Sequence, residues 1–353
     1  MTRRNDAVPQ KGTVLWGDDD IGFYDEGDEM KKFWSRVLIA AISMAFYGVF
    51  NFSSSQILNY DARQKEPALE IVKLHGGIYM AKGAWGANVG FLIGPKGVLV
   101  IDSKATTEAT KKVIGEIGKI TKLPITTIVY THSDPDSFNG RDAYPDSAES
   151  ISSLKILEDW EKNTTVYLEA DAPASIYRPW PSYYFTPALT FTGQLNFHLG
   201  NEKVELHHYG PAHTSGDTII VFPGDRLAFI GDLVFPGREP MIQDQKGGST
   251  GGLLRTLTIL LSLKPEIRTF IPSHGDPIGR EEIKQTIHTI EIVSDRVKTL
   301  FDAGRSLEEI KKEFGVLIPP AEPGLWVWPS LAATVYRELS ERQINQRPSI
   351  SYE

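Results

Sequence analysis

The sequence predicts a layered α/β sandwich, in which sheets form the inside and helices cover the outside. Two observations predict this fold class. Strand-like and helix-like segments follow one another in the same order twice along the chain after residue 70. The β-branched segment at 125–132 is also apolar enough to be a buried strand, which is typical of a sheet that is covered on both faces. No internal repeat of short fixed period is present, so a solenoid is not expected.

In the first half, four short strands are expected within residues 70–102, with GPKG at 94–97 as the hairpin turn before the last one. A helix is expected over residues 104–119, because its apolar residues return every three or four positions. These stripe residues are Val113, Ile117 and Ile120. A strand rich in β-branched residues follows at 125–132, and a second helix is expected at 153–163.

The second half follows a loop at residues 171–195 that is rich in proline and aromatic residues. Strands are expected over residues 194–231, and a strand at 269–274 leads into a loop. The expected helices lie at 250–263, 280–303, 306–314 and 330–341. The helix at 280–303 is the most clearly amphipathic, since its apolar residues are spaced by three and four positions. The aromatic residues either cover a substrate pocket or belong to core or an oligomer contact. They are Tyr177, Trp180, Tyr183, Tyr184 and Phe185, with Trp326 and Trp328 near the end.

The segment before the sandwich has a separate character. Residues 1–29 hold three basic and eight acidic residues, whereas residues 30–55 hold three basic residues and an uncharged apolar run of 14. A basic stretch, an apolar run and a polar end are the plan of a secretory signal peptide. We therefore interpret 1–29 as a disordered acidic extension upstream of a true start at Met30, with cleavage near Ser55. The alternatives are an uncleaved signal anchor, which would associate with a membrane through residues 33–52, and a buried core helix.

The composition excludes cysteine-based sites and limits the residues that could bind a metal. The chain of 353 residues has no cysteine, which excludes disulfides, iron–sulfur clusters and thiol nucleophiles. Any metal must therefore be held by the 8 histidines and the 45 aspartates and glutamates. The net charge of −8 argues against a nucleic-acid partner, and a small-molecule substrate is expected instead. The oligomeric state is left open.

Five apolar strands end in side chains that can bind a metal. The strand ends are GVLVID with Asp102, IVYTHSDPDS with His132, Asp134, Asp136 and Ser137, GPAHT with His213, FIGD with Asp232, and PSH with His274. A single histidine or GD pair at a strand end is usually structural. Five such ends indicate a shared cleft, because loops after buried strands can converge on one site. Imidazoles and carboxylates suit zinc, iron or manganese.

In this order, the motifs resemble the metallo-β-lactamase superfamily over about residues 70–280. The resemblance implies a four-layer αββα sandwich with a metal site at one edge, formed here by a domain at 56–320 that is followed by a helical tail at 321–353. It implies metal ligands at His132, Asp134, Asp136, His213, Asp232 and His274. Asp136 and Asp232 would also serve in catalysis, and Asp232 would bridge two ions. Asp102, Ser137 and Thr214 would support the ligands from behind. Thr214 and Asp217 would fix the tautomer of His213, or Asp217 would instead cap the turn before the following strand.

Two positions depart from the His-x-His-x-Asp-His signature of that family. Asp134 stands where the second histidine should be, and Ser137 stands where the closing histidine should be. Asp134 can still bind a metal, and it favours iron or manganese more than histidine would. A neutral serine is a poor ligand, so the second site is expected to be weak or empty. One or two zinc ions are expected, with iron or manganese as alternatives.

These expectations lead to an exported metal-dependent hydrolase, either periplasmic or secreted, and membrane-anchored if the apolar segment is retained. A metal-bound hydroxide would attack an ester, lactone, thioester, amide or phosphoester. A second hypothesis is a mononuclear iron dioxygenase of the persulfide-dioxygenase type, because His132, His213 and Asp232 form a two-histidine, one-carboxylate set. A third is a non-catalytic binding protein with a degenerate site, which would gain support if Asp134 faced away from His132 and His213.

Overall fold

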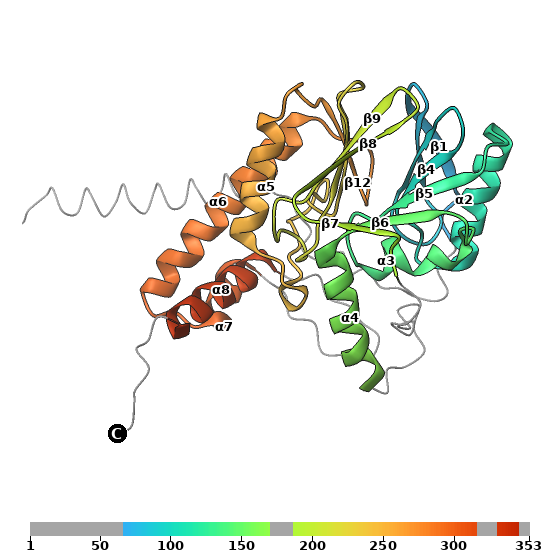
Figure 1. Ribbon diagram of the computed structural model, residues 1–353. Helices are drawn as coiled ribbons and strands as arrows, with labels where there is room; N and C mark the ends of the chain where they lie inside the picture. The colour runs from blue at the N-terminus through green and yellow to red at the C-terminus, as the bar shows by residue number, and fades with distance from the viewer. Residues whose placement is uncertain (1–65, 170–185, 316–329, 346–353) are drawn as a thin grey trace, which may run out of the picture. The chain divides into compact units, whose positions relative to one another are not determined.

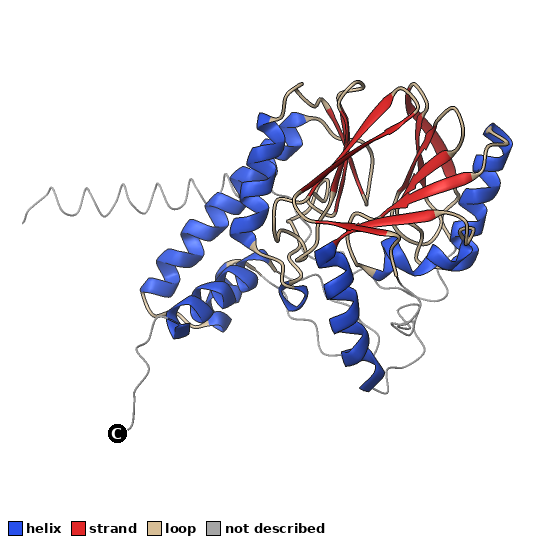
Figure 2. Ribbon diagram, in the orientation of Figure 1, coloured by secondary structure: helices blue, strands red, loops and turns tan. Residues whose placement is uncertain are grey.

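The computed structural model describes residues 66–169, 186–315 and 330–345. In this part of the chain the strands form two sheets, and helices lie on both outer sides of the pair (Figure 1, Figure 2). The segments at 1–65, 170–185, 316–329 and 346–353 lie outside the described residues.

The first sheet has seven strands, which lie in the order of the chain. They are β1 (Glu70–His75), β2 (Ile78–Lys82), β3 (Val89–Ile93), β4 (Val98–Ile101), β5 (Ile125–Val129), β6 (Glu149–Ser153) and β7 (Leu189–Phe191). Strands β1 to β4 pair antiparallel, and β4 to β7 pair parallel. The change of direction at β4 follows the sequence, because a tight turn precedes β4 and helix α2 (Thr107–Ile120) separates it from β5.

The second sheet has five strands in the order β12-β11-β10-β9-β8. They are β8 (Gln194–Leu199), β9 (Glu202–His207), β10 (Ile219–Phe222), β11 (Leu227–Gly231) and β12 (Thr269–Pro272). All neighbours pair antiparallel except β11 and β12, which are parallel and are connected through helix α5 (Thr250–Ser262).

Three apolar clusters fill the spaces between the layers. One lies between the two sheets, one lies between the first sheet and helices α2 and α4 (Leu154–Glu169), and one lies between the second sheet and the C-terminal helices. The C-terminal helices that contribute are α5, α6 (Arg280–Asp302), α7 (Leu307–Glu313) and α8 (Leu331–Asn345). The molecule therefore has the predicted αββα order of layers, with α5, α6 and α8 on one side and α2 on the other (Figure 1).

Strand β4 illustrates why the strands are apolar along their whole length. Val98 and Val100 pack in the cluster under the helices, whereas Leu99 and Ile101 pack in the cluster between the sheets. Successive side chains of a strand point to opposite faces, so a strand that is covered on both sides must be apolar at every position.

The two sheets meet at one edge. Strands β4 and β5 are parallel neighbours, as are β11 and β12, so each pair brings its carboxyl ends to the same edge. Backbone hydrogen bonds connect the sheets there, from Thr218 N to Thr131 O at 2.7 Å and from Asn88 N to Ser273 O at 2.7 Å. The polar residues that follow these strands are thereby brought together.

Several elements differ from the sequence prediction. Strands β6 and β7 were not predicted, because ESISS is polar and β7 has only three residues. The short helices α3 (Pro135–Phe138) and η1 (Asn139–Ala143) were also not predicted, because they are too short to show a helical pattern in the sequence. Helix α4 continues to Glu169, beyond the predicted end at residue 163.

Other predictions fall outside the described residues. They concern the acidic extension, the signal-like segment and the aromatic residues at 177–185, 326 and 328. Within residues 66–169, 186–315 and 330–345, no helix combines the length and the apolar character that a membrane span needs.

Candidate metal centre

Four buried side chains form a compact group at the shared edge of the sheets. They are His132, Asp134, His213 and Asp232, and their ligand atoms all lie within 4.8 Å of one another. Each side chain is at most 7% exposed. Among the described residues, this is the one group of three or more histidines and acids that meets this distance.

The distances in the group suit a single ion. Asp134 Oδ2 lies 3.2 Å from His213 Nε2 and 4.0 Å from His132 Nε2, and Asp232 Oδ2 lies 3.5 Å from His132 Nε2 and 3.7 Å from His213 Nε2. Ligand atoms at about 2.1 Å from a tetrahedrally bound zinc ion are about 3.4 Å apart. These four distances are close to the spacing that one tetrahedrally bound ion requires.

Hydrogen bonds behind the two histidines direct their free nitrogens into the group. His213 Nδ1 lies 2.9 Å from the carbonyl oxygen of Met241, which can only accept a hydrogen bond. His213 Nδ1 therefore carries the proton, and Nε2 is left with a lone pair. His132 Nδ1 lies 2.7 Å from Thr131 Oγ1, whose own proton is donated to Asp102 Oδ2 at 2.6 Å. His132 Nε2 consequently also presents a lone pair, and it is buried without a hydrogen-bond partner.

The group attracts positive charge. Burial disfavours the imidazolium of His132, but the carboxylates of Asp232 and Asp134 outweigh it and raise the pKa of His132 to about 10. Burial similarly opposes ionisation of Asp232, yet the neighbouring His274 and His132 hold the pKa of Asp232 at about 2. Two imidazoles, which carry protons while no cation is bound, and two carboxylates thus share one buried space. The residues fit a divalent cation, which would supply the charge that protons supply in its absence.

Asp136 and His274 lie beside this group rather than in it. His274 Nε2 is 3.0 Å from Asp136 Oδ2 and 3.7 Å from Asp232 Oδ1. The two oxygens of Asp232 therefore face different histidines, which is the arrangement that a bridging carboxylate requires. The side chain of His274 is 41% exposed and that of Asp136 is 23% exposed, so this side of the centre is open.

Ser137 offers little to a second ion. Its side chain is fully buried, and its Oγ has no hydrogen-bond partner within the described structure. It sits in helix α3, which follows Asp134 and places Asp136 on the open side. The side chains beside the group that could contribute donors to a second ion are Asp136, Asp232 and His274.

Asp102 supports His132 from behind. Its carboxylate accepts hydrogen bonds from Thr131 N at 2.7 Å and Thr131 Oγ1 at 2.6 Å. Burial raises the pKa of Asp102 to about 7, against the opposing effect of His132. Asp102 has φ +63°, a left-handed conformation that aspartate tolerates better than most residues.

The predicted role of Thr214 is wrong. Its Oγ1 donates to Asp217 Oδ1 at 3.0 Å, and Asp217 Oδ2 accepts from Thr214 N and Ala212 N. These bonds shape the turn before β10, whereas the carbonyl of Met241 holds the imidazole of His213. Thr214 and Asp217 therefore position the loop and not the ring.

Sequence reasoning missed Lys246 and Gln243. Lys246 Nζ lies 2.7 Å from Asp134 Oδ1, and Gln243 Nε2 donates to Asp134 Oδ2 at 3.1 Å. Both residues lie at the short helix η3 (Asp244–Lys246), which no motif marks in the sequence. Only the folded chain brings them to the centre.

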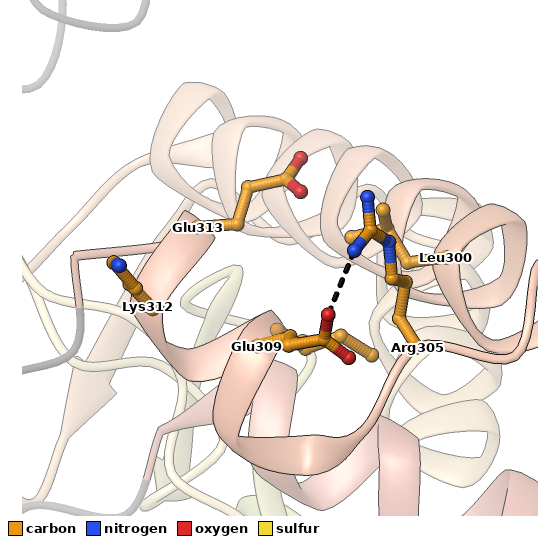
Figure 3. Close-up of a pocket in the computed structure, with 6 residues that line it drawn as sticks. Leu300, Arg305, Glu309, Lys312 and Glu313 are labelled. Carbon is orange, nitrogen blue, oxygen red and sulfur yellow. Dashed lines mark hydrogen bonds and ion pairs between the residues drawn. The ribbon is translucent and has the colours of Figure 1, made fainter.

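Two hollows lie elsewhere on the described surface. One of about 440 Å³ is lined by residues of α4 and of the loops around His213, and it reaches Lys246. The other, of about 410 Å³, lies between α6 and α7 (Figure 3). Among its charged residues, Arg305 pairs with Glu309 at 2.7 Å, and none of the lining residues belongs to the metal group.

Comparison with known proteins identifies the family of this chain. A family model described as the metallo-beta-lactamase superfamily matches residues 83–274. A linear primary-alkylsulfatase from Pseudomonas sp. is 21% identical over 266 residues, which cover 64% of this chain and 49% of that protein. A type 2 metallo-beta-lactamase from Elizabethkingia meningoseptica is 20% identical over 239 residues, which cover 66% and 88%. The chain thus spans about half the length of the alkylsulfatase.

Solved structures give the same fold. A metallo-beta-lactamase from Pontibacter korlensis matches with a TM-score of 0.53 and 18% identity, covering 64% of this chain and 99% of that one. A stereoselective inverting sec-alkylsulfatase from Pseudomonas sp. matches with a TM-score of 0.58 and 16% identity, covering 79% and 52%. The family model covers more than half of the chain, and its match includes every residue of the metal group. The chain belongs to the metallo-β-lactamase superfamily.

Proposed function

We propose that this chain is a metal-dependent hydrolase that uses one ion, held by His132, Asp134, His213 and Asp232. The observation that carries the proposal is the convergence of two imidazole lone pairs and two carboxylates in one buried group with the spacing of a tetrahedral site. Zinc is the ion expected from the family, and the two carboxylates also suit iron or manganese. When bound, such an ion acts as a Lewis acid and makes a bound water acidic near neutral pH.

The open side of the centre supplies the groups that can handle protons. Asp136 and His274 form a hydrogen-bonded pair at 3.0 Å that is partly exposed. In the proposed hydrolysis, Asp136 Oδ2 orients the attacking water and accepts its proton. His274 Nε2 donates a proton to the leaving group. Asp232 would hold its three neighbouring histidines in place, His132 and His213 through Oδ2 and His274 through Oδ1. The substrate class is an ester in the broad sense, and relatives that are named as alkylsulfatases add sulfate esters to the candidates.

The two rival functions receive less support from the geometry. Asp134 Oδ2 faces His213 and His132 rather than turning away, which argues against a degenerate binding site. The same carboxylate would take up a coordination position that a two-histidine, one-carboxylate oxygenase keeps free for oxygen and substrate. An iron-loaded protein that consumes oxygen with a persulfide would nevertheless favour the dioxygenase.

The test combines metal analysis with a panel of substrates. Purified protein, loaded with Zn²⁺, Fe²⁺ or Mn²⁺ and desalted, should retain about one ion per chain and should hydrolyse at least one nitrophenyl acetate, phosphate or sulfate. His213→Ala should lose both the ion and the activity, whereas His207→Ala should keep both, because His207 bonds Glu205 on β9 outside the group. Retention of less than about 0.2 ion per chain with every metal would refute the proposal, and two tightly held ions would refute its one-ion form.

A further inference from the structure

Asp134 is the most heavily bonded ligand of the group. Its Oδ1 accepts from Lys246 Nζ at 2.7 Å, and its Oδ2 accepts from Gln243 Nε2 at 3.1 Å. Lys246 Nζ also donates to the carbonyl oxygen of Ser133 at 3.3 Å. The Asp134 side chain is 7% exposed and that of Lys246 is 11% exposed, so the ion pair is almost completely buried.

The two oxygens of Asp134 have different partners. Oδ2 is the oxygen that faces the imidazole nitrogens, at 3.2 Å from His213 and 4.0 Å from His132. Oδ1 is the oxygen that meets the ammonium of Lys246. The lysine therefore contacts the carboxylate from the side away from the proposed ion, and it leaves the inner oxygen available as a ligand.

The charges explain why such a lysine is needed. Three neutral histidines and one carboxylate carry −1, whereas two histidines and two carboxylates carry −2. An aspartate in place of the second histidine thus adds one negative charge to a buried site. Lys246 adds one positive charge at 2.7 Å from Asp134, so the sum over the two histidines, the two carboxylates and this lysine is −1. A buried carboxylate without such a partner would be costly.

We propose that Lys246 is the obligatory partner of Asp134, a positioning residue whose fixed charge allows a carboxylate to replace a histidine at this metal centre. The inference rests on the proposed function, because it assumes that an ion binds at the group. The effect on metal affinity of a substitution at position 134 should then depend on the residue at position 246, and the reverse. Restoring histidine at position 134 alone should weaken the site, because it leaves the ammonium buried beside an ion with no carboxylate between them.

The opposite role for Lys246 makes a different prediction. If its ammonium competed with the ion for Asp134, removing it would tighten metal binding. As a positioning residue, it orients the carboxylate, and groups that orient ligands from behind usually change metal affinity by about 10–100-fold when they are removed. The sign of the change distinguishes the two roles.

A double-mutant cycle tests the proposal. Zn²⁺ affinity of the full chain is measured by competition with a chromophoric chelator for the wild type, Lys246→Met, Asp134→His and the double variant. Co²⁺ absorption reports the ligand set. Lys155→Met is the matched control, because Lys155 lines the same hollow but pairs with Glu158 at the surface. Thermal unfolding of each metal-free variant checks the fold, and Lys246→Gln replaces Lys246→Met if the latter is unfolded.

We expect each single variant to bind Zn²⁺ at least about tenfold more weakly than the wild type and the double variant to recover most of that loss. Lys155→Met should have no effect. Additive effects, or tighter binding by Lys246→Met or by Asp134→His alone, would overturn the inference while the hydrolase proposal stands. A wild-type protein that binds none of the tested ions would overturn both.

Discussion

At the scale of single residues, the centre depends on groups that never touch the ion. Asp102 reaches His132 through the hydroxyl of Thr131, and a backbone carbonyl, that of Met241, sets the tautomer of His213. Each bond leaves one imidazole nitrogen free to bind. Such supporting groups determine whether a set of ligands is ready to receive a metal before it arrives.

Replacing Asp102 separates its backbone role from its charge. Asp102→Ala should lower the free energy of unfolding of the metal-free protein by about 3 kcal/mol, because Thr131 loses a buried acceptor and alanine is strained at φ +63°. Asp102→Asn keeps one acceptor oxygen and tolerates this φ, so it should lose about 1 kcal/mol. Urea denaturation in the presence of a chelator measures both. Equal losses would mean that neither the acceptor nor the backbone conformation matters.

The residues of the centre could be predicted from the sequence in part. His132, His213 and Asp232 follow buried strands or lie in a recognisable motif, and an apolar run followed by such a residue is a local signal. Lys246 has no local signal, because its partner Asp134 lies 112 positions away. Met241 contributes a backbone carbonyl, which every residue type possesses. Contacts of these kinds arise from the packing of loops and cannot be read from spacing.

At the scale of elements, helix α5 holds the loop of His213 in place. Ser249 caps the helix by accepting a hydrogen bond from Gly252 N, and Ser249 N donates to Ala212 O at 2.8 Å. A Cβ on Gly252 would lie 1.8 Å from the carbonyl oxygen of Pro211. The glycine-rich run GGSTGG at residues 247–252 therefore includes a position where two backbones are in contact.

Two neighbouring glycines give a matched test of this contact. Gly252→Ala should lower the free energy of unfolding by about 2 kcal/mol and weaken metal binding, since α5 and the His213 loop must separate. Gly251→Ala should be neutral or stabilising by up to about 1 kcal/mol, because a Cβ there meets nothing within 4 Å and alanine favours helix. Denaturation curves and Zn²⁺ titrations of the two variants provide the comparison. A Gly252→Ala protein with normal metal affinity would show that the loop is held by other contacts.

The elements that could be predicted well from the sequence are those with a clear hydrophobic pattern. Strands β4 and β10 are buried at every position, and helix α6 has one long apolar stripe. Strand β6 escaped prediction because its serines are buried through hydrogen bonds, such as that from Ser153 Oγ to Gly216 O at 2.7 Å. Hydrophobic pattern carries no information about strands that are held in this way.

At the scale of the whole molecule, metal binding should be linked to protons and to stability. The pKa of His132 is raised to about 10 and that of His274 to about 9, in each case because neighbouring carboxylates outweigh the effect of burial. In the metal-free protein these imidazolium groups stabilise the fold fully below their unfolded pKa of about 6.5, and this contribution is lost as the pH rises through 9 and 10. An imidazole must be neutral to bind an ion, so metal competes with protons.

The stabilisation by Zn²⁺ should therefore increase with pH. At a free concentration of about 100 times the dissociation constant, an ion adds about 2.7 kcal/mol, which is a rise in Tm of roughly 5–10 °C for a chain of this size. At a fixed Zn²⁺ concentration, the rise in Tm should be larger at pH 8.5 than at pH 6.5, as measured by thermal scans against chelator-treated protein. Titration in buffers of different ionisation enthalpy should show release of at least one proton per ion. A rise in Tm that shrinks with pH would contradict the assignment of His132 as a ligand.

The origin of the four donors has a consequence for how the fold is lost. His132 and Asp134 follow strand β5 of the first sheet, whereas His213 and Asp232 lie in loops that follow β9 and β11 of the second sheet. A bound ion is thus a removable cross-link that closes a chain loop of about a hundred residues, and such closures restrict an unfolded chain strongly. The sheets cannot separate at that edge until at least one protein ligand dissociates from the ion. We expect the metal-bound protein to unfold slowly and in one step. In the chelator-treated protein, we expect the two sheets to separate first at the edge where they meet.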